Sequence, residues 1–272
     1  MTRYPATVAQ GRSTKVLTTR WQAGTARRRP DELIVEEPLE IRLDGHLVTT
    51  TMRTPGHDFE LAAGFCLTEG LLAGAPVLAC RYCGTGPAAG SDFNVVSVET
   101  GGRAAVPEAR LTTATSSCGI CGSTRLDELA TRLGPLPVTE PFPGEVLASL
   151  PERMRAHQQL FDVTGAVHAA GASTRDGSVL VVREDIGRHN AVDKVVGRLL
   201  FDGRLPVTGA ALAVSGRASF EIVHKAWAAG FAAVVAVSAP SSLAVRTASR
   251  AGMVLAGFAR DGRLNVYAGE VV

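Results

Sequence analysis

Apolar and β-branched residues are interleaved with polar ones in the first half of the chain, and this pattern predicts β-strands. The Asp-Gly pair at 44–45 predicts a tight hairpin turn between two of them. A helix is expected to begin near His57 or Asp58 and to end at Gly70. The predicted strands cover residues 15–21, 32–43, 46–54 and 93–99.

The second half has wholly apolar runs that alternate with segments of helical periodicity. Asn190, Ser219 and Ser241 are candidate N-caps for three helices, and a second Asp-Gly turn at 261–262 separates the last two strands. The predicted strands are 178–184, 210–216, 231–240, 253–260 and 264–269, and the predicted helices are 190–201, 219–230 and 241–252. Apolar strands alternating with helices predict an α/β fold whose mostly parallel sheet is covered on both faces.

These patterns divide the chain into three parts. Residues 1–30 hold seven basic and no acidic side chains, and we expect a flexible, solvated arm, with anion binding as the alternative. Residues 31–145 are expected to form a smaller β-rich domain. Residues 146–272 are expected to form the α/β domain.

Composition narrows the class of protein only slightly. Of 272 residues, 46% are hydrophobic and 20% are charged, as in ordinary globular proteins. The net charge of +2 by itself argues neither for nor against a nucleic-acid partner, and we expect none. No apolar run approaches the roughly 20 residues that span a bilayer, and no signal peptide is evident. We therefore expect a cytoplasmic protein without a membrane partner, whose five cysteines are free thiols, ligands or catalysts.

The loops that follow the apolar strands are the candidate ligand site, because ligands of such sheets bind beyond the carboxyl ends of the strands. These loops carry hydroxyl groups and arginines, and helix N-termini there favour anions. The candidate residues are Ser215, Ser241, Arg183, Arg188, Arg217, Arg260 and Arg263. Taken singly, the serines would be helix caps and the arginines surface charges; together they predict a phosphorylated ligand.

Other motifs bear on that ligand. The chain has neither a Walker loop nor G-x-G-x-x-G, so an ATPase or a dinucleotide dehydrogenase is not supported. His189 lies near two aspartates and is a candidate general base or, with more support, a hydrogen-bonding loop residue. His168 is expected to be structural or to line the pocket, and His224 to be exposed.

The pair Cys118-x-x-Cys121 has three interpretations. With Cys80-x-x-Cys83 it could form a structural zinc site. It could be a redox dithiol, or it could carry a nucleophilic thiolate just before a helix N-terminus, where the pKa of a thiol is lowered. The residues leave the metal and carrier interpretations evenly balanced, whereas Cys66 is expected to be a small core residue.

Several segments resemble the FdhD/NarQ family of formate dehydrogenase accessory sulfurtransferases. The likeness begins near residue 33 and rests on "RTPGHDFELAAGFCLTEGLL", "SSCGICGS", "FDVTGAVHAA", "REDIGRHNAVDKVVG", "VSGRASFEIVHKA", "VSAPSSLAV" and "AGMVLAGFARDGRLNVY". Cys80, Cys83 and the basic arm lie outside this pattern, and Cys66 replaces a more usual Leu.

The resemblance implies a sulfur carrier. A cysteine desulfurase would supply persulfide sulfur to Cys118, with Cys121 in support, and the sulfur would pass to a molybdenum or tungsten bis-molybdopterin guanine dinucleotide cofactor destined for the formate dehydrogenase catalytic subunit. The stretch implied to bind this cofactor is Phe258, Ala259, Arg260, Asp261, Gly262 and Arg263. A cytidine deaminase-like fold and a homodimer are also implied, although the deaminase zinc signature is absent and no permanently bound metal is expected. The alternative is a non-catalytic cofactor chaperone with a structural zinc site made by the four paired cysteines.

Overall fold

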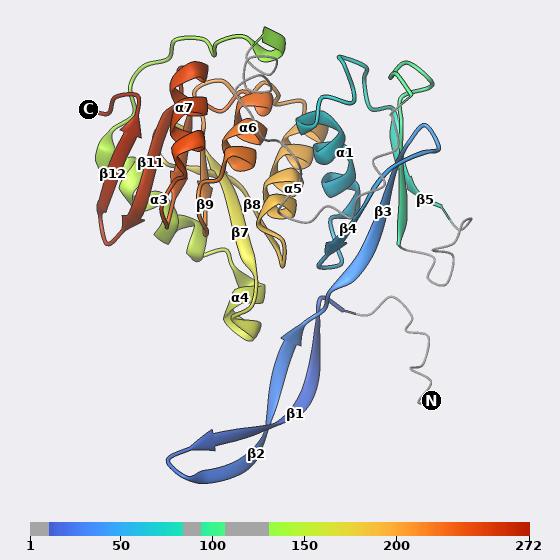
Figure 1. Cartoon of the computed structure of the whole chain (residues 1–272), viewed down its shortest axis with the longest axis vertical. Coiled ribbons are helices and arrows are strands. Elements are labelled where there is room, and N and C mark those ends of the chain that lie inside the picture. The colour runs from blue at the N-terminus through green and yellow to red at the C-terminus, as the bar shows by residue number, and fades with distance from the viewer. Residues whose placement is uncertain (1–10, 84–93, 107–130) are drawn as a thin grey trace.

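The computed structural model describes residues 11–83, 94–106 and 131–272, and these residues form three sheets with helices between them (Figure 1). The largest sheet has six strands in the order β12-β11-β10-β9-β7-β8. Its strands are β7 (His168–Ser173), β8 (Val179–Asp185), β9 (Ala211–Val214), β10 (Ala233–Ala236), β11 (Val254–Arg260) and β12 (Arg263–Ala268). All residues of β9 and β10 are buried, because helices cover both faces of the sheet there.

The expectation of a mostly parallel sheet is confirmed only in part. In the six-stranded sheet, β9–β10 and β10–β11 pair in parallel, whereas β11–β12, β7–β8 and β7–β9 are antiparallel. The cause is β7, which lies between β8 and β9 and continues into β8 through a tight turn over residues 174–177. Two strands joined by so short a turn must be antiparallel. The α/β class itself is confirmed.

Helices cover the two faces of this sheet unequally. Helix α3 (Gly144–Arg155) packs on one face, with the short helix α4 (Gln159–Thr164) at its end. The other face carries α5 (Arg188–Phe201), α6 (Phe220–Ala229) and α7 (Ser242–Ala251), whose apolar sides form the larger hydrophobic core. The Leu136 amide donates to the Ala251 carbonyl and Phe142 forms a β-bridge with Val271, so the chain contacts this unit before the expected residue 146.

A second, smaller unit is built from the first half of the chain. Its four-stranded sheet has the order β4-β3-β6-β5, formed by β3 (Glu37–Leu43), β4 (His46–Arg53), β5 (Ala79–Tyr82) and β6 (Val95–Glu99). Helix α1 (Asp58–Thr68) packs on this sheet, and it begins where the sequence predicts and ends just before Gly70. Cys66 is fully buried in the core of this unit, which confirms its expected role.

The two units meet where α1 crosses α5 with almost no separation. A Cβ atom added at Gly64 would lie 1.9 Å from the carbonyl oxygen of Asp193, and one added at Gly197 would lie 1.8 Å from that of Glu60. Side chains are excluded from both positions, since real Cβ atoms do not approach other atoms so closely. The paired glycines therefore let the two helix backbones touch.

Buried ion pairs flank the crossing. The Lys194 ammonium lies 2.7 Å from the carboxylate of Asp185 and donates to the carbonyl oxygen of Thr54 at 2.9 Å, with both charged side chains fully buried. On the other side, Lys225 contacts Asp193 at 3.0 Å and Glu69 at 3.1 Å. These pairs link the two units, because each has contacts on both sides of the interface.

The N-terminal segment differs from the expected flexible arm. Residues 13–34 form an antiparallel hairpin of two ten-residue strands, β1 (Ser13–Gln22) and β2 (Thr25–Ile34), which projects from the body (Figure 1). The strand predicted over 32–43 is consequently divided between β2 and β3 at Val35 and Glu36. Residues 1–10 lie outside the described part of the chain.

The three predicted helix caps have three different outcomes. Ser241 caps α7 as predicted, since its hydroxyl accepts a hydrogen bond from the Ala244 amide at 3.1 Å. Ser219 occupies the N-cap position of α6 without a capping hydrogen bond from its side chain. Asn190 is not a cap, because α5 begins at Arg188 with Gly187 as its N-cap, and the Asn190 amide instead donates to the Met52 carbonyl at 2.8 Å.

In the ranges 11–83, 94–106 and 131–272, the helices are all too short or too polar to reach across a lipid bilayer.

The crossing generates a stability prediction. We expect Gly197→Ala to lower the free energy of unfolding by about 2 kcal/mol or more, because the new methyl group must separate two packed helices. Urea unfolding followed by circular dichroism measures the change. Gly144→Ala is the matched control, since a Cβ there meets only ordinary contacts of 3.5 Å or longer. Equal stability of the two variants would contradict the proposed role of the crossing.

Candidate functional site

Four strands end at the same edge of the six-stranded sheet. Since β7 is antiparallel to both β8 and β9, strand β8 runs in the same direction as β9, β10 and β11. Their carboxyl ends therefore share one edge, where β7 and β12 begin. The antiparallel β7 thus preserves the predicted convergence of strand-end loops and adds His168 to it.

A cavity of about 550 Å³ opens at this edge beside α3 and α4. This volume lies within the range of small-molecule sites. Its walls are mainly apolar, with a minority of polar side chains. The polar lining residues are Glu152, Arg155, Gln158, His168, Ser215 and Arg260. Two arginines on a largely apolar wall suit a ligand that carries both a flat organic part and an anionic part.

Three of the predicted binding residues line the cavity: Ser215, Ala259 and Arg260. The Ser215 hydroxyl accepts a hydrogen bond from the Ala169 amide at 2.9 Å and lies 3.3 Å from Nδ1 of His168. The hydroxyl therefore connects the first residues of β7 to the end of β9. His168, which the sequence left between a structural and a lining role, has both.

Burial lowers the pKa of His168, and the nearby Arg188 and His189 lower it further, whereas Asp185 opposes them. Arg188, the first residue of α5, is not among the residues that line the cavity. Its Nε is buried without a hydrogen-bond partner among the described residues. A guanidinium N–H of this kind at a helix N-terminus is a donor suited to an anion.

His189 contacts α6 rather than the cavity. Its Nε2 lies 3.4 Å from the Ser219 hydroxyl and 3.7 Å from the Glu221 carboxylate. The hydrogen bond from His189 lowers the pKa of Glu221 to about 2 despite the opposing effect of burial. Of the two interpretations of His189, this geometry favours a hydrogen-bonding role over a general base, although His189 lies in the first turn of α5 and not in a loop.

Arg183 does not reach the cavity. Its guanidinium donates to both oxygens of Glu60 on α1, at 2.5 and 2.8 Å, and so joins the two units. Although burial alone would raise it, hydrogen bonds from Arg183 and His57 lower the pKa of Glu60 to about 2. The predicted anion site thus loses Arg183 to an ion pair inside the protein.

The segment 258–263 turns the corner from β11 into β12. Asp261 and Gly262 have φ angles of 50° and 70°, as a tight turn requires, whereas Phe258, with φ of 52°, lies at an irregularity in the pairing of β11 with β12. The Asp261 amide donates to Glu152 at 2.9 Å, which ties the turn to α3. Arg263 is 76% exposed and lies 3.4 Å from Asp261, outside the cavity lining.

Arg217 and Ser241 are exposed and are absent from the cavity lining, although both lie in the predicted strand-end loops. Sequence reasoning missed Arg155 and Phe161, because they come from α3 and α4 and not from a loop after a strand. The Arg155 guanidinium stacks over the Phe161 ring, 4.7 Å from its centroid. In the sequence, the neighbouring Arg153 is the only indication of a cationic role for Arg155.

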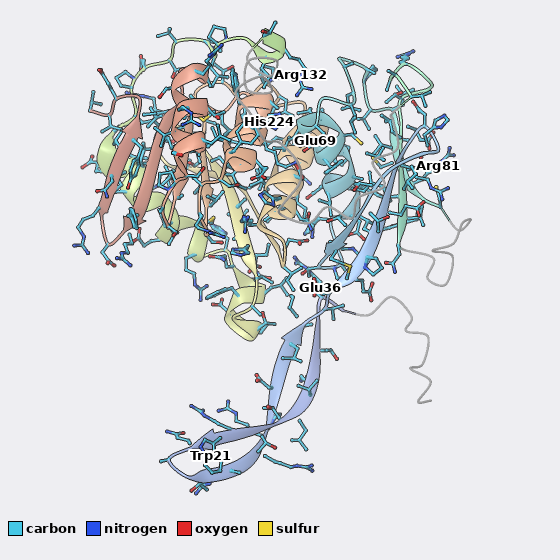
Figure 2. All side chains as sticks on the ribbon, viewed as in Figure 1. Trp21, Glu36, Glu69, Arg81, Arg132 and His224 are labelled. Carbon is cyan, nitrogen blue, oxygen red and sulfur yellow. The ribbon has the colours of Figure 1, made fainter. Side chains whose placement is uncertain are left out.

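Cys118 and Cys121 lie outside the described residues, as does most of the predicted helix that follows them, of which residues 131–133 are described and are helical. The chain that follows them makes contacts with α6 and α7. Arg132 contacts Nε2 of His224 at 3.4 Å, beside Glu69 (Figure 2). Trp227 donates to the Gly134 carbonyl at 2.8 Å, and the Leu136 amide donates to the Ala251 carbonyl at 2.9 Å.

His224 is buried rather than exposed as expected, and burial lowers its pKa to about 4. The unprotonated ring can therefore accept a hydrogen bond from Arg132.

The second cysteine pair lies on an edge strand. Cys80 belongs to β5 and packs against the small unit's core, and burial raises its pKa to about 12. Cys83 is half-buried, next to the undescribed residues 84–93. Two of the four thiols of the alternative zinc site are thus described, and that alternative stays a prediction.

The family follows from comparison with known proteins. A model of the FdhD/NarQ family matches residues 34–271. The chain belongs to the FdhD/NarQ family. A sulfur carrier protein FdhD from Corynebacterium efficiens is 49% identical over 253 residues, covering 89% of this chain and 91% of that protein. One of the same name from Streptomyces avermitilis is 50% identical over 256 residues, covering 91% and 90%.

The fold agrees with a solved structure described as a formate dehydrogenase accessory protein from Desulfotalea psychrophila. The TM-score is 0.72 at 22% sequence identity, and the match covers 96% of this chain and 100% of that one. The fold described above is therefore shared with that protein.

The Glu60–Arg183 pair predicts how stability depends on pH. Glu60 has a pKa of about 2 in the folded protein and about 4.5 when unfolded, so its contribution is present above pH 4.5 and lost as the pH falls toward 2. Between pH 4.5 and pH 2, we expect the free energy of unfolding, measured in urea, to fall less for Glu60→Gln than for the wild type. Glu140→Gln, at a side chain that is 79% exposed, is the control and should follow the wild type. Parallel profiles for Glu60→Gln and wild type would refute the assignment.

Proposed function

We propose that this chain is a sulfur carrier for formate dehydrogenase. It would accept sulfur from a cysteine desulfurase as a persulfide on Cys118 and pass it to a bis-molybdopterin guanine dinucleotide cofactor. The observation that carries the proposal is the identity of 49–50% with proteins named sulfur carrier protein FdhD, over about nine-tenths of both chains. The Cys118-x-x-Cys121 pair supplies the required thiols.

The chemistry needs one accessible thiolate. The Cys118 thiolate attacks the outer sulfur of the donor's persulfide; a new S–S bond forms, the donor's S–S bond breaks, and the donor thiolate leaves. In the second step a nucleophilic acceptor attacks the outer sulfur and supplies the electron pair of the new bond. The S–S bond of the Cys118 persulfide breaks, and the Cys118 thiolate leaves with the electron pair of that bond. A lower thiol pKa favours that departure. Cys121 would assist by relay or resolution.

The cavity at the strand edge fits the phosphate-bearing part of the cofactor, which we treat as substrate. Arg260 and Arg155 provide cations on its wall, and Ser215 provides a hydroxyl. The buried Nε of Arg188, without a partner among the described residues, is a donor at the same edge. The apolar walls suit a flat ring system.

The attachment at Arg132 sets how far Cys118 could travel. Cys118 lies thirteen positions before Thr131 in the chain, and a segment of that length spans at most about 45 Å. A compact chain of this size has a radius of gyration of about 18 Å. Chain length therefore permits the thiol to meet both a donor and the cavity.

The cysteine chemistry gives the first test of this function. We expect Cys118→Ala to abolish both persulfide loading and activation of formate dehydrogenase, because no other thiol occupies its position. Intact-mass analysis after incubation with a cysteine desulfurase and cysteine should show one reducible sulfur atom on the wild type and on Cys83→Ala, and none on Cys118→Ala. Full activation by Cys118→Ala would refute the role. Stoichiometric zinc in protein purified without chelator, lost on mutation of either cysteine pair, would favour the zinc-chaperone alternative.

The cavity gives a second test, with guanosine diphosphate as the probe. We expect Arg260→Ala to weaken its binding at least tenfold, because a charge-assisted hydrogen bond is worth about 1.5–3 kcal/mol. Arg263→Ala should change the affinity little, since that side chain is exposed and lies outside the cavity lining. Isothermal titration calorimetry compares the two. Equal effects of the two variants would argue against this cavity as the binding site.

A further inference from the structure

The short helix α4 forms much of one wall of the cavity. Gln158 and Phe161 line the cavity, and so do residues 165–167, which connect α4 to β7 (Figure 1). The helix has only six residues, and a helix so short is not stable on its own in water. Contacts with the rest of the protein must therefore determine where this wall lies.

A buried carboxylate makes a contact that fixes α4. The side chain of Glu184 accepts hydrogen bonds from the backbone amides of Leu160 and Phe161, at 2.9 and 2.8 Å, one on each carboxylate oxygen. Glu184 is 5% exposed and is not among the residues that line the cavity. The first amides of a helix have no partners within it, and the helix dipole favours a negative charge there. Glu184 thus caps α4 from a distant part of the chain.

This cap comes from the sheet and not from the sequence of the helix itself. Gln158, at the N-cap position, makes no capping hydrogen bond with its side chain. A Ser or Asp at that position could pair with the same amides, but it would not tie α4 to the sheet. Glu184 belongs to β8 and pairs with Ala169 of β7, so its carboxylate is attached to a rigid strand. The hydrogen bonds that make burial of this carboxylate tolerable therefore also fix the helix to the sheet.

The effect of the cap reaches two side chains of the cavity wall. Phe161 supplies one of the two capped amides and is itself a lining residue. The Arg155 guanidinium stacks over the Phe161 ring and forms an ion pair of 2.6 Å with Asp162. Both of these partners of Arg155 belong to α4, so the position of this cation depends on the position of the helix. Arg260, the other arginine of the lining, belongs to β11 instead.

We propose that Glu184 is a positioning residue for the cavity, because it holds α4 where Phe161 and Arg155 can contact a ligand. The inference rests on the proposed function in one respect, namely that this cavity binds the guanine nucleotide part of the cofactor. An aromatic ring and a guanidinium both stack well against a flat ring system. A displacement of α4 would weaken both contacts together, although Glu184 itself touches no ligand.

Isothermal titration calorimetry with guanosine diphosphate measures the effect on binding. We expect Glu184→Ala to weaken binding at least about fivefold, because groups displaced by about 1 Å lose much of their contribution. Glu184→Gln keeps one acceptor oxygen and should restore part of the affinity. Gly197→Ala is the control for loss of stability alone, since it perturbs the helix crossing, and it should bind like the wild type. Circular dichroism establishes that each variant is folded.

A double-mutant cycle identifies the path of the effect. In protein that already carries Phe161→Ala and Arg155→Ala, adding Glu184→Ala should change the affinity less than about twofold, because the side chains that it positions are gone. In protein that carries Arg260→Ala, the same substitution should have its full effect, because Arg260 lies on a different element. A full effect in both backgrounds would overturn the proposed path through α4.

Hydrogen–deuterium exchange tests the cap without a ligand. We expect the amides of residues 160–164 to exchange at least about tenfold faster in Glu184→Ala than in the wild type. Unchanged exchange, wild-type affinity in Glu184→Ala, or an equal loss of affinity in Gly197→Ala would each overturn the positioning role. A wild type that does not bind guanosine diphosphate would instead refute the cavity as the nucleotide site, and the inference with it.

Discussion

The close crossing of α1 and α5 is the contact on which the arrangement of the two units depends. Gly64 and Gly197 allow the helix backbones to touch, and buried charges on either side can then reach across the interface. Lys194 contacts Asp185 and Thr54, while Lys225 contacts Asp193, Glu69 and Thr68. Burial opposes the charge of Lys225, but the neighbouring carboxylates outweigh it and raise its pKa. An interface of this kind is specific, because any separation removes Thr54 from Lys194, and Thr68 and Glu69 from Lys225, and so leaves buried charges with fewer partners.

The same interface explains why two residues do not have the roles that the sequence predicted, anion binding for Arg183 and helix capping for Asn190. Arg183 and Asn190 both lie near the strand edge, yet each is directed toward the smaller unit, Arg183 to Glu60 and Asn190 to Met52. The polar segment 183–194 therefore serves two purposes. Part of it holds the units together, and Arg188 remains available at the edge with a donor that has no partner among the described residues.

Local pattern predicted most elements of the α/β unit and of α1, because apolar periodicity and Asp-Gly turns are local signals. Local pattern did not predict the direction of β7. That direction depends on the short turn between β7 and β8, which hydrophobic periodicity does not reveal. The cavity was anticipated only in part. Ser215 and Arg260 follow strands and could be found by that rule, whereas Arg155 and Phe161 come from helices placed by tertiary packing. Arg183 failed as a prediction because its partner, Glu60, is 123 residues away in the chain.

The hairpin illustrates a different limit. Its basic residues were visible in the sequence, and a run of charge without apolar periodicity ordinarily indicates a solvated arm. Pairing of the two strands changes the meaning of the same residues, since it moves Leu17 and Trp21 to one side and Arg20 and Arg27 to the other. A disordered arm would present no such faces. The register of the hairpin, more than its composition, therefore determines which side chains share a face, and the register is set by the turn at Ala23 and Gly24, both of which have positive φ angles.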